Sequence, residues 1–367
     1  MHLYARYIRT LLLTAVAVLF FVAGFTLTID PYGYFGTPRI TGLSRIKPAS
    51  ATRNRTVKPI AMARINPRTL ILGNSRPEVG LDPASPIWPK AKRPIYNFGI
   101  PGAGVSEQGR YGLLALSKQS LRFVYWDVDF VDFMADRRSM KYCNRSSAAV
   151  KVVVPKSSTW KRLKDTTLAL WSLRAVLDSV WTVLSQYRPY SANRTMLGFN
   201  PARDYWPTIV AEGQGVLFKE KNAEVRKRLF GQGLMLVGKG CNWSSDFEAL
   251  NEVLEAFKAK GIHVVLFINP YHVDYLNIIR EAGLWQQFQT WKNYLAEIAR
   301  ETGSELWDFS KLDPRKQENV ETLRRGQALQ WFWEPAHYRR ALGRLMLSQM
   351  LDGFDSINVP VGVRLVP

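Results

Sequence analysis

The chain has 367 residues, 47% of them hydrophobic and 12% aromatic, which is ample for a packed core and excludes a disordered protein. Its 50 basic and 30 acidic residues give a net charge of +20. Such a charge attracts anionic surfaces. Because no RNP, zinc-finger or Gly-rich phosphate motif accompanies it, the sequence favours anionic glycans or lipid headgroups over nucleic acid. Composition leaves one alternative open, a solvated surface of high pI.

The amino-terminal residues predict a membrane anchor. Residues 11–27 are apolar apart from small residues and threonines, and at about 1.5 Å per residue such a run crosses a bilayer core. Arg6 and Arg9 precede the run and Asp30 follows it, so the positive-inside bias places the amino terminus in the cytoplasm and the remainder outside. The run exceeds the apolar region of a signal peptide and has no clear cleavage site, so we expect an uncleaved, single-pass anchor.

Changes in composition and pattern divide the chain into four regions. We expect a tail and anchor at 1–30, a stalk at 31–65, a domain at 66–355 with an insertion at about 135–240, and a carboxyl-terminal tail at 356–367. The stalk is predicted because Pro, Gly, Arg and Ser are frequent there without a sustained period.

Short apolar runs predict the strands of the domain. They cover residues 69–72, 94–98, 123–128, 263–268 and 305–309. Helical patterns lie between several of them, at residues 106–118, 246–260 and 285–301. Strands that alternate with helices predict an α/β domain whose parallel sheet is covered on both faces.

The insertion contains leucines at a spacing of seven. They are Leu163, Leu170, Leu177 and Leu184, with Trp160, Trp171 and Trp181 nearby. The pattern predicts a helix over 160–187 that packs on the core, or, as the alternative, a lid or partner-binding helix over the active edge. Cys143 and Cys241 are the only two cysteines. Their pairing in an oxidising compartment stays open, because the sequence gives no separation between them.

Polar residues follow each predicted strand, at the edge where an open α/β sheet binds ligands. The turn Gly73-Asn74-Ser75 after the first strand presents a hydroxyl, and Glu334, three residues before His337, can orient that histidine as a base. These residues predict a serine nucleophile, with a turn or capping serine as the alternative. Asp129 and Asp132 follow the third strand, and His272 follows the fourth.

The remaining polar candidates have two interpretations each. We expect His263 to point into the sheet, and His272 either to contact substrate or to be structural. Arg76 either binds an anionic sugar or pairs with a carboxylate of the core.

Three sequence blocks resemble those of the SGNH, or GDSL-type, hydrolase superfamily. Gly-x-Ser75 is similar to its first block, residues 97–102 to its second and Glu334-Pro-Ala-His337 to its last, in the same order over residues 66–352. The resemblance implies a flavodoxin-like three-layer sandwich with a central parallel sheet. It implies that Ser75 is the nucleophile, His337 the base and Glu334 the acid, without a metal or cofactor.

The resemblance also implies an oxyanion hole made by the backbone N–H groups of Ser75 and Gly102. Asn74, Arg76, Asp129 and His272 are then candidates for substrate binding. Three positions depart from the family pattern: Asn74 and Glu334 replace aspartates, and no asparagine follows the third strand, where the family places a side-chain oxyanion donor. Because one missing donor costs about 10²- to 10³-fold in turnover, low activity, a substitute donor or no activity would fit.

The anchor and domain together resemble accessory proteins that acetylate alginate or pass D-alanine to teichoic acids. Those relatives act beside a membrane-bound O-acyltransferase that donates the acyl group. We therefore expect a bacterial inner-membrane protein, mostly periplasmic or extracellular, that is an O-acyltransferase or esterase of an anionic or acylated polysaccharide. The alternative is a non-catalytic SGNH-like assembly protein that binds a glycan or a membrane partner.

Overall fold

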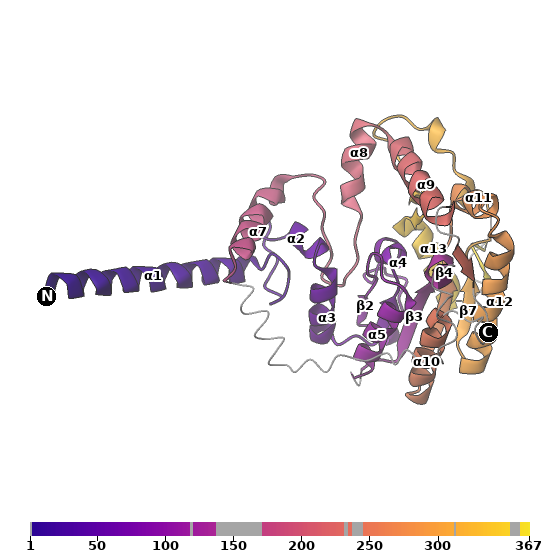
Figure 1. Cartoon of the computed structure of the whole chain (residues 1–367), viewed down its shortest axis with the longest axis horizontal. Helices are drawn as coiled ribbons and strands as arrows, with labels where there is room; N and C mark the ends of the chain where they lie inside the picture. The colour runs from indigo at the N-terminus through magenta and orange to yellow at the C-terminus, as the bar shows by residue number, and fades with distance from the viewer. Residues whose placement is uncertain are drawn as a thin grey trace. The chain divides into compact units, whose positions relative to one another are not determined.

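Figure 1 shows the computed structural model of the chain, which describes residues 2–117, 120–136, 171–230, 234–236, 245–311, 313–352 and 360–367. The chain divides into two compact units. Unit 1 comprises residues 1–61 and 155–196, and unit 2 comprises residues 62–154 and 197–367. Cys143 and Cys241, whose pairing the sequence leaves open, lie outside the described residues.

Unit 2 contains a mostly parallel sheet in the order β10-β7-β6-β3-β1-β2. Its strands are β1 (Thr69–Leu72), β2 (Ile95–Asn97), β3 (Phe123–Val128), β6 (His263–Ile268), β7 (Glu305–Asp308) and β10 (Val363–Val366). The first five are the predicted strands, and they pair in parallel. Their order is the 2-1-3-4-5 order of flavodoxin-like sheets, in which the strand order reverses between β1 and β3.

The sixth strand differs from the sequence prediction. Residues 363–366, expected within a carboxyl-terminal tail, form β10 and pair antiparallel to β7 at the edge of the sheet. His263 also differs, because its side chain is exposed and lies 2.9 Å from Glu305 Oε1 instead of pointing into the sheet. It is the first residue of β6, where the strand has only begun to enter the core.

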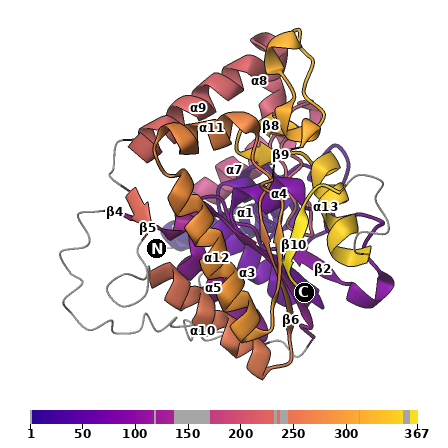
Figure 2. The same ribbon diagram turned by 90° about the vertical axis from the view of Figure 1, so that its right-hand side faces the viewer.

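Helices cover both faces of this sheet, as Figure 2 shows. On one face lie α5 (Val105–Leu116), α10 (Ser245–Ala259) and α12 (Trp285–Thr302), which match the three predicted helices within two residues. On the other face, α13 (Arg340–Asp352) packs on the sheet. Side chains alternate accordingly: Leu72 and Trp126 contact the α5 and α10 side, whereas Ile71 and Tyr125 belong to the cluster that contains α13.

Smaller elements complete unit 2. They are the helices α4 (Ser75–Gly80), α8 (Trp206–Ala211), α9 (Gln214–Phe230) and α11 (Val273–Glu281), and the strand pairs β4 (Met134–Asp136) with β5 (Leu234–Leu236) and β8 (Phe332–Glu334) with β9 (His337–Tyr338). Short 3-10 helices cover Lys90–Lys92, Phe130–Phe133, Arg203–Tyr205, Pro314–Gln317 and Val320–Thr322.

Unit 1 contains the predicted anchor as α1 (His2–Ile29), together with α2 (Pro48–Ala51), α7 (Leu173–Leu184) and most of α3 (Asn54–Ile65). The most apolar 18 residues within Tyr4–Ile29 have a mean hydropathy of 2.4, and the segment is long and apolar enough to cross a membrane. Of the helix predicted over 160–187, the described part is α7 with a 3-10 turn, Ser185–Tyr187. Leu163, Leu170 and Trp160 lie outside the described residues.

Residues 31–61, which belong to the stalk predicted at 31–65, are folded within unit 1. The Tyr32 hydroxyl donates to Asp178 Oδ2 at 2.6 Å, and the Ile46 N–H donates to Gln186 Oε1 at 2.9 Å. Their partners are about 140 residues away in the sequence. No local period could reveal this packing, because the partner residues belong to the insertion.

Candidate active site

The turn after β1 places Ser75 at the carboxyl edge of the sheet. Gly73 has φ +150°, and a Cβ there would lie 2.5 Å from the Asp127 Cβ, so the close approach of this turn to β3 requires glycine. Asn74 caps α4, because its Oδ1 accepts from the Arg76 N–H at 2.9 Å. Ser75 is therefore the first residue of α4, where its own N–H has no intrahelical acceptor.

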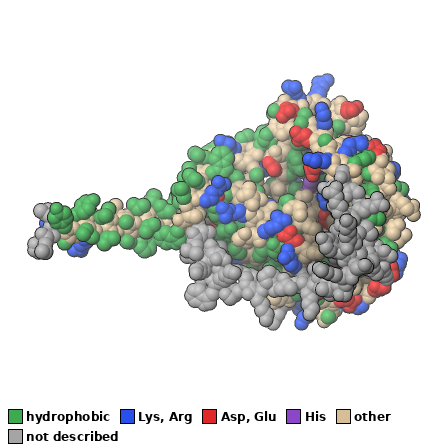
Figure 3. Space-filling model, in the orientation of Figure 1, with side chains coloured by type: hydrophobic (Ala, Val, Ile, Leu, Met, Phe, Trp, Pro, Cys, Tyr) green, Lys and Arg blue, Asp and Glu red, His purple; other side chains and the backbone are tan. Residues whose placement is uncertain are grey.

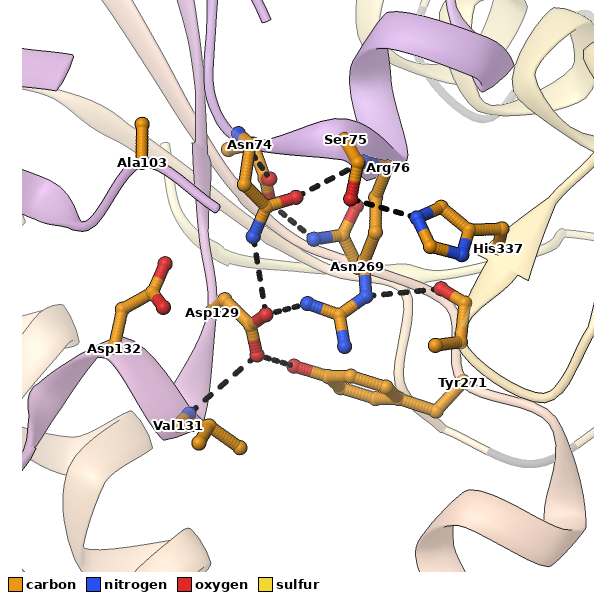
Figure 4. Close-up of polar contacts among 12 residues, drawn as sticks. Asn74, Ser75, Arg76, Ala103, Asp129, Val131, Asp132, Asn269, Tyr271 and His337 are labelled. Carbon is orange, nitrogen blue, oxygen red and sulfur yellow. Dashed lines mark hydrogen bonds and ion pairs between the residues drawn. The ribbon is translucent and has the colours of Figure 1, made fainter. Parts of the chain in front are cut away.

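The turn between β8 and β9 supplies the other two predicted residues. Glu334 ends β8, His337 begins β9, and the two are paired across the turn. His337 Nε2 lies 2.7 Å from the Ser75 Oγ (Figure 4). His337 Nδ1 contacts Glu334 Oε1. The structure thus brings Ser75, His337 and Glu334 together, although 262 positions separate the serine from the histidine.

The protonation of Glu334 determines the direction of these hydrogen bonds. Burial alone would raise the pKa of this carboxyl, but the neighbouring His337 and the Ala336 N–H outweigh burial and hold the pKa below its ordinary value. An ionised carboxylate only accepts hydrogen bonds, so His337 Nδ1 carries the proton. In the neutral ring, Nε2 then accepts the hydrogen bond from the Ser75 hydroxyl. This arrangement prepares Nε2 to remove the Ser75 proton.

A buried network lies directly behind the turn that carries Ser75. The Arg76 guanidinium forms an ion pair with Asp129, and its Nε donates to the Ala336 carbonyl at 2.9 Å. Asp129 also accepts from Asn74 Nδ2 at 3.1 Å and from the Tyr271 hydroxyl at 2.9 Å. Because Ala336 lies between Glu334 and His337, Arg76 connects the turn that carries Ser75 to the turn that carries His337.

Two more carboxyl groups near this network have pKa values above the ordinary range. Burial raises the pKa of Asp127 to about 7, although Arg76, the Asn74 N–H and the Asn269 amide each lower it. Burial likewise raises the pKa of Asp132 to about 7. Both groups are therefore partly protonated near neutral pH.

The two backbone donors predicted for an oxyanion hole have no hydrogen-bond partner among the described residues. One is the N–H of Ser75, and the other is the N–H of Gly102, whose φ of +71° favours glycine. The acidic side chains after β3 are those of Asp129 and Asp132, as the sequence indicates. The Asn74 amide does not replace the missing asparagine, because its Nδ2 donates to Asp129.

The predicted substrate-binding residues have the following positions. Three of them, Asn74, Arg76 and Asp129, contact one another. Arg76 therefore pairs with a carboxylate of the core, which is one of its two predicted roles. His272 is buried and caps α11, accepting from the Asp274 N–H, while its other ring nitrogen lies 2.9 Å from the Glu318 carbonyl. Contact of these four residues with substrate stays a prediction.

Some residues of the site were not singled out from the sequence. Tyr271 and Asn269 follow β6, and both face the carboxylates of β3. Asp127 lies inside the apolar run of β3, and an acidic residue within such a run was a signal that could have identified it. Within the described ranges, no group of three or more His, Cys, Asp or Glu side chains is placed to hold a metal ion.

Comparison with known proteins assigns no family to this chain. A scan against protein-family models finds no match, and a search of curated proteins finds none either.

Proposed function

We propose that this protein is a membrane-anchored serine acyltransferase or esterase, and that Ser75, His337 and Glu334 form its catalytic triad. The observation that carries the proposal is the 2.7 Å contact of the Ser75 hydroxyl with His337 Nε2, with Glu334 on the opposite ring nitrogen. The resemblance of three sequence blocks to SGNH hydrolases supports the same assignment.

The proposed reaction has two halves with one covalent intermediate. His337 Nε2 takes the hydroxyl proton while Ser75 Oγ attacks the acyl carbonyl, and the negative oxygen receives hydrogen bonds from the N–H groups of Ser75 and Gly102. The tetrahedral species collapses, and the leaving alcohol takes the proton from Nε2. A hydroxyl of the acceptor then attacks the acyl-serine and gives its proton to His337 Nε2. The bond between Ser75 Oγ and the acyl carbon breaks, and Oγ takes the proton back from Nε2. Glu334 fixes the tautomer and stabilises the imidazolium in both halves.

The substrate class follows from setting and charge. An exported domain on a single anchor would meet a cell-surface or secreted polysaccharide, and a net charge of +20 favours an anionic one. With a sugar hydroxyl as the acceptor the reaction is a transfer, and with water it is hydrolysis. In the transfer reaction, a membrane-bound O-acyltransferase is the proposed source of the acyl group. Residues after α1 are then on the periplasmic or extracellular side, as Arg6 and Arg9 indicate.

The test is covalent labelling of the full-length protein in detergent. We expect a fluorophosphonate to add one phosphonyl mass to the wild-type chain and to the control Ser117→Ala, which changes an exposed serine. Ser75→Ala should take up none, and His337→Ala should react at least about 10²-fold more slowly because the general base is lost. Equal labelling of the Ser75→Ala variant would refute the nucleophile assignment.

A non-catalytic role is favoured by one observation. Carboxylates follow β3 where a hydrolase of this type would place an amide donor, and an ionised carboxylate would repel an oxyanion. In that case the same fold would bind a glycan or a membrane partner during assembly. The labelling experiment separates the two functions, because a binding protein would leave the wild-type chain unmodified by both fluorophosphonate and activated acyl esters.

A further inference from the structure

Helix α7 in unit 1 exposes its apolar face, and this orientation is unusual. Its inner face consists of small or polar residues, with Ala175, Ser179 and Thr182 buried. The opposite face is apolar and between 41% and 83% exposed; it comprises Leu173, Leu177, Val180, Trp181, Leu184 and Tyr187. We call these six residues the α7 face. A helix on a soluble domain normally buries its large apolar residues, so the α7 face requires an apolar neighbour.

The position of α7 within unit 1 indicates which neighbour this is. α7 packs against α1, and Asp178 of α7 accepts from Tyr32, three residues beyond the end of α1. The Lys47 ammonium donates to the carbonyls of Ile29 and Asp30, which fixes the chain where α1 ends. The α7 face therefore lies near the carboxyl end of α1. At this end, a membrane-crossing helix would leave the bilayer. Figure 3 shows hydrophobic side chains along α1 and over α7.

The composition around the α7 face suits the headgroup region of a bilayer. Tryptophan and tyrosine concentrate at this depth, and Trp181 and Tyr187 both belong to the α7 face. The Arg188 guanidinium lies 4.4 Å from the centre of the Trp181 ring, next to the apolar surface. An apolar helix face flanked by arginines is typical of a helix that lies in the membrane interface.

The charges of unit 1 favour an anionic lipid surface. In the described residues after α1, which are 30–61 and 171–196, nine Lys or Arg residues accompany two acidic residues, Asp30 and Asp178. Both acidic side chains are buried, so the exposed charges of these segments are positive. Basic residues close to a bilayer are attracted to its anionic headgroups.

We propose that the α7 face lies in the headgroup region of the membrane that α1 crosses, on the side where α1 ends. Unit 1 is then held on the bilayer by two contacts, a spanning helix and an interfacial helix. The proposal rests on α1 as a membrane span, but not on the acyl chemistry of unit 2. A protein partner or a second copy of the chain would be a different occupant of the α7 face.

The experiment uses the full-length chain in nanodiscs of phosphatidylethanolamine and phosphatidylglycerol. The photo-crosslinking residue p-benzoylphenylalanine replaces Leu177 or Leu184 in the α7 face. Phe20, exposed in the middle of α1, is the positive control, and Val210, a similarly exposed apolar residue of α8, is the matched control. After illumination, intact mass reports whether a phospholipid has been added. Two positions are used so that one poorly folded variant does not decide the result.

We expect a phospholipid adduct at positions 20, 177 and 184, and at least about fivefold less at 210, because an interfacial helix stays within reach of acyl chains. An adduct at 20 but at neither 177 nor 184 would overturn the proposal, and so would equal labelling at 210. A product of twice the chain mass would identify a second copy as the occupant. In native membranes, crosslinking of 177 and 184 to another protein instead of lipid would likewise overturn it.

Discussion

Replacing Arg76 with methionine should destabilise unit 2 strongly. Arg76 is 6% exposed, and its guanidinium forms an ion pair with Asp129, which is 3% exposed. Methionine has a similar length but no charge, so Asp129 would remain buried without its cation. Loss of one partner of a buried pair costs about 3–5 kcal/mol. At about 2–4 °C per kcal/mol, this corresponds to a fall in Tm of roughly 6–20 °C.

The assay is thermal unfolding of the full-length protein followed by tryptophan fluorescence, with all variants in the same detergent. The double variant Arg76→Met/Asp129→Asn removes the uncompensated charge and keeps one acceptor oxygen, in place of the two that accept from Tyr271 and Asn74. It should therefore be more stable than Arg76→Met alone. A Tm for Arg76→Met within about 2 °C of the wild type would refute the assigned pair, since loss of a buried partner has a larger effect. So would strictly additive losses in the double variant.

Arg76→Lys separates the positioning role from the stabilising role. Lysine keeps the charge beside Asp129 but cannot donate to both Asp129 and the Ala336 carbonyl in the fixed geometry of a guanidinium. We expect most of the stability to remain. The rate of Ser75 labelling should fall by about tenfold or more, because misplacement of a catalytic group by about 1 Å costs up to 10²-fold. A labelling rate equal to that of the wild type would limit Arg76 to a role in stability.

Three further outcomes are expected. Glu334→Gln should slow fluorophosphonate labelling by about 10²- to 10⁴-fold, since a neutral amide neither fixes the His337 tautomer nor stabilises the imidazolium; wild-type rates would remove Glu334 from the triad. Denaturant titrations should show stability falling as pH rises from about 5 to 8, because the raised pKa of Asp127 and of Asp132, about 7 each, means that the folded state binds more protons there. Asp127→Asn should flatten that slope, and an unchanged slope would contradict the assignment. Alkaline phosphatase fused after Pro367 should be active if the carboxyl terminus is exported, whereas an inactive fusion at normal expression would reverse the orientation.

Local sequence patterns were sufficient to predict the sheet of unit 2 but not its edge. The parallel strands are short apolar runs bounded by turn residues, and α10 and α12 have clear helical periods. β10 was missed because Val363–Val366 is four residues long, alternates little and pairs with a strand more than 50 positions earlier. The pairing of β10 with β7 can be recognised only in the folded sheet.

The chemistry of the site was more predictable than the organisation of unit 1. Ser75 could be identified from sequence because it follows a strand that ends at the ligand-binding edge of a parallel sheet. His337 could be linked to it because Glu334 has a fixed offset from the histidine and because the order of the blocks resembles SGNH hydrolases. By contrast, the packing of Tyr32 against Asp178 depends on a contact between segments 146 positions apart. The role of Arg76 likewise stayed open, since sequence does not say whether a carboxylate of the core reaches it.

The cost of the buried network favours the catalytic proposal over the assembly alternative. Arg76, Asp127, Asp129 and Glu334 are all at most 6% exposed, and each contacts Asn74, Ser75 or His337 or pairs with a residue that does. Figure 4 shows Arg76 and Asp129 beside Ser75. Buried ion pairs contribute little net stability compared with apolar packing, so stability alone gives no reason for this concentration of charge. A glycan-binding surface would place its charges where a ligand can reach them. Here they instead fix the backbone on both sides of the contact between Ser75 and His337, which is where a proton transfer requires fixed geometry.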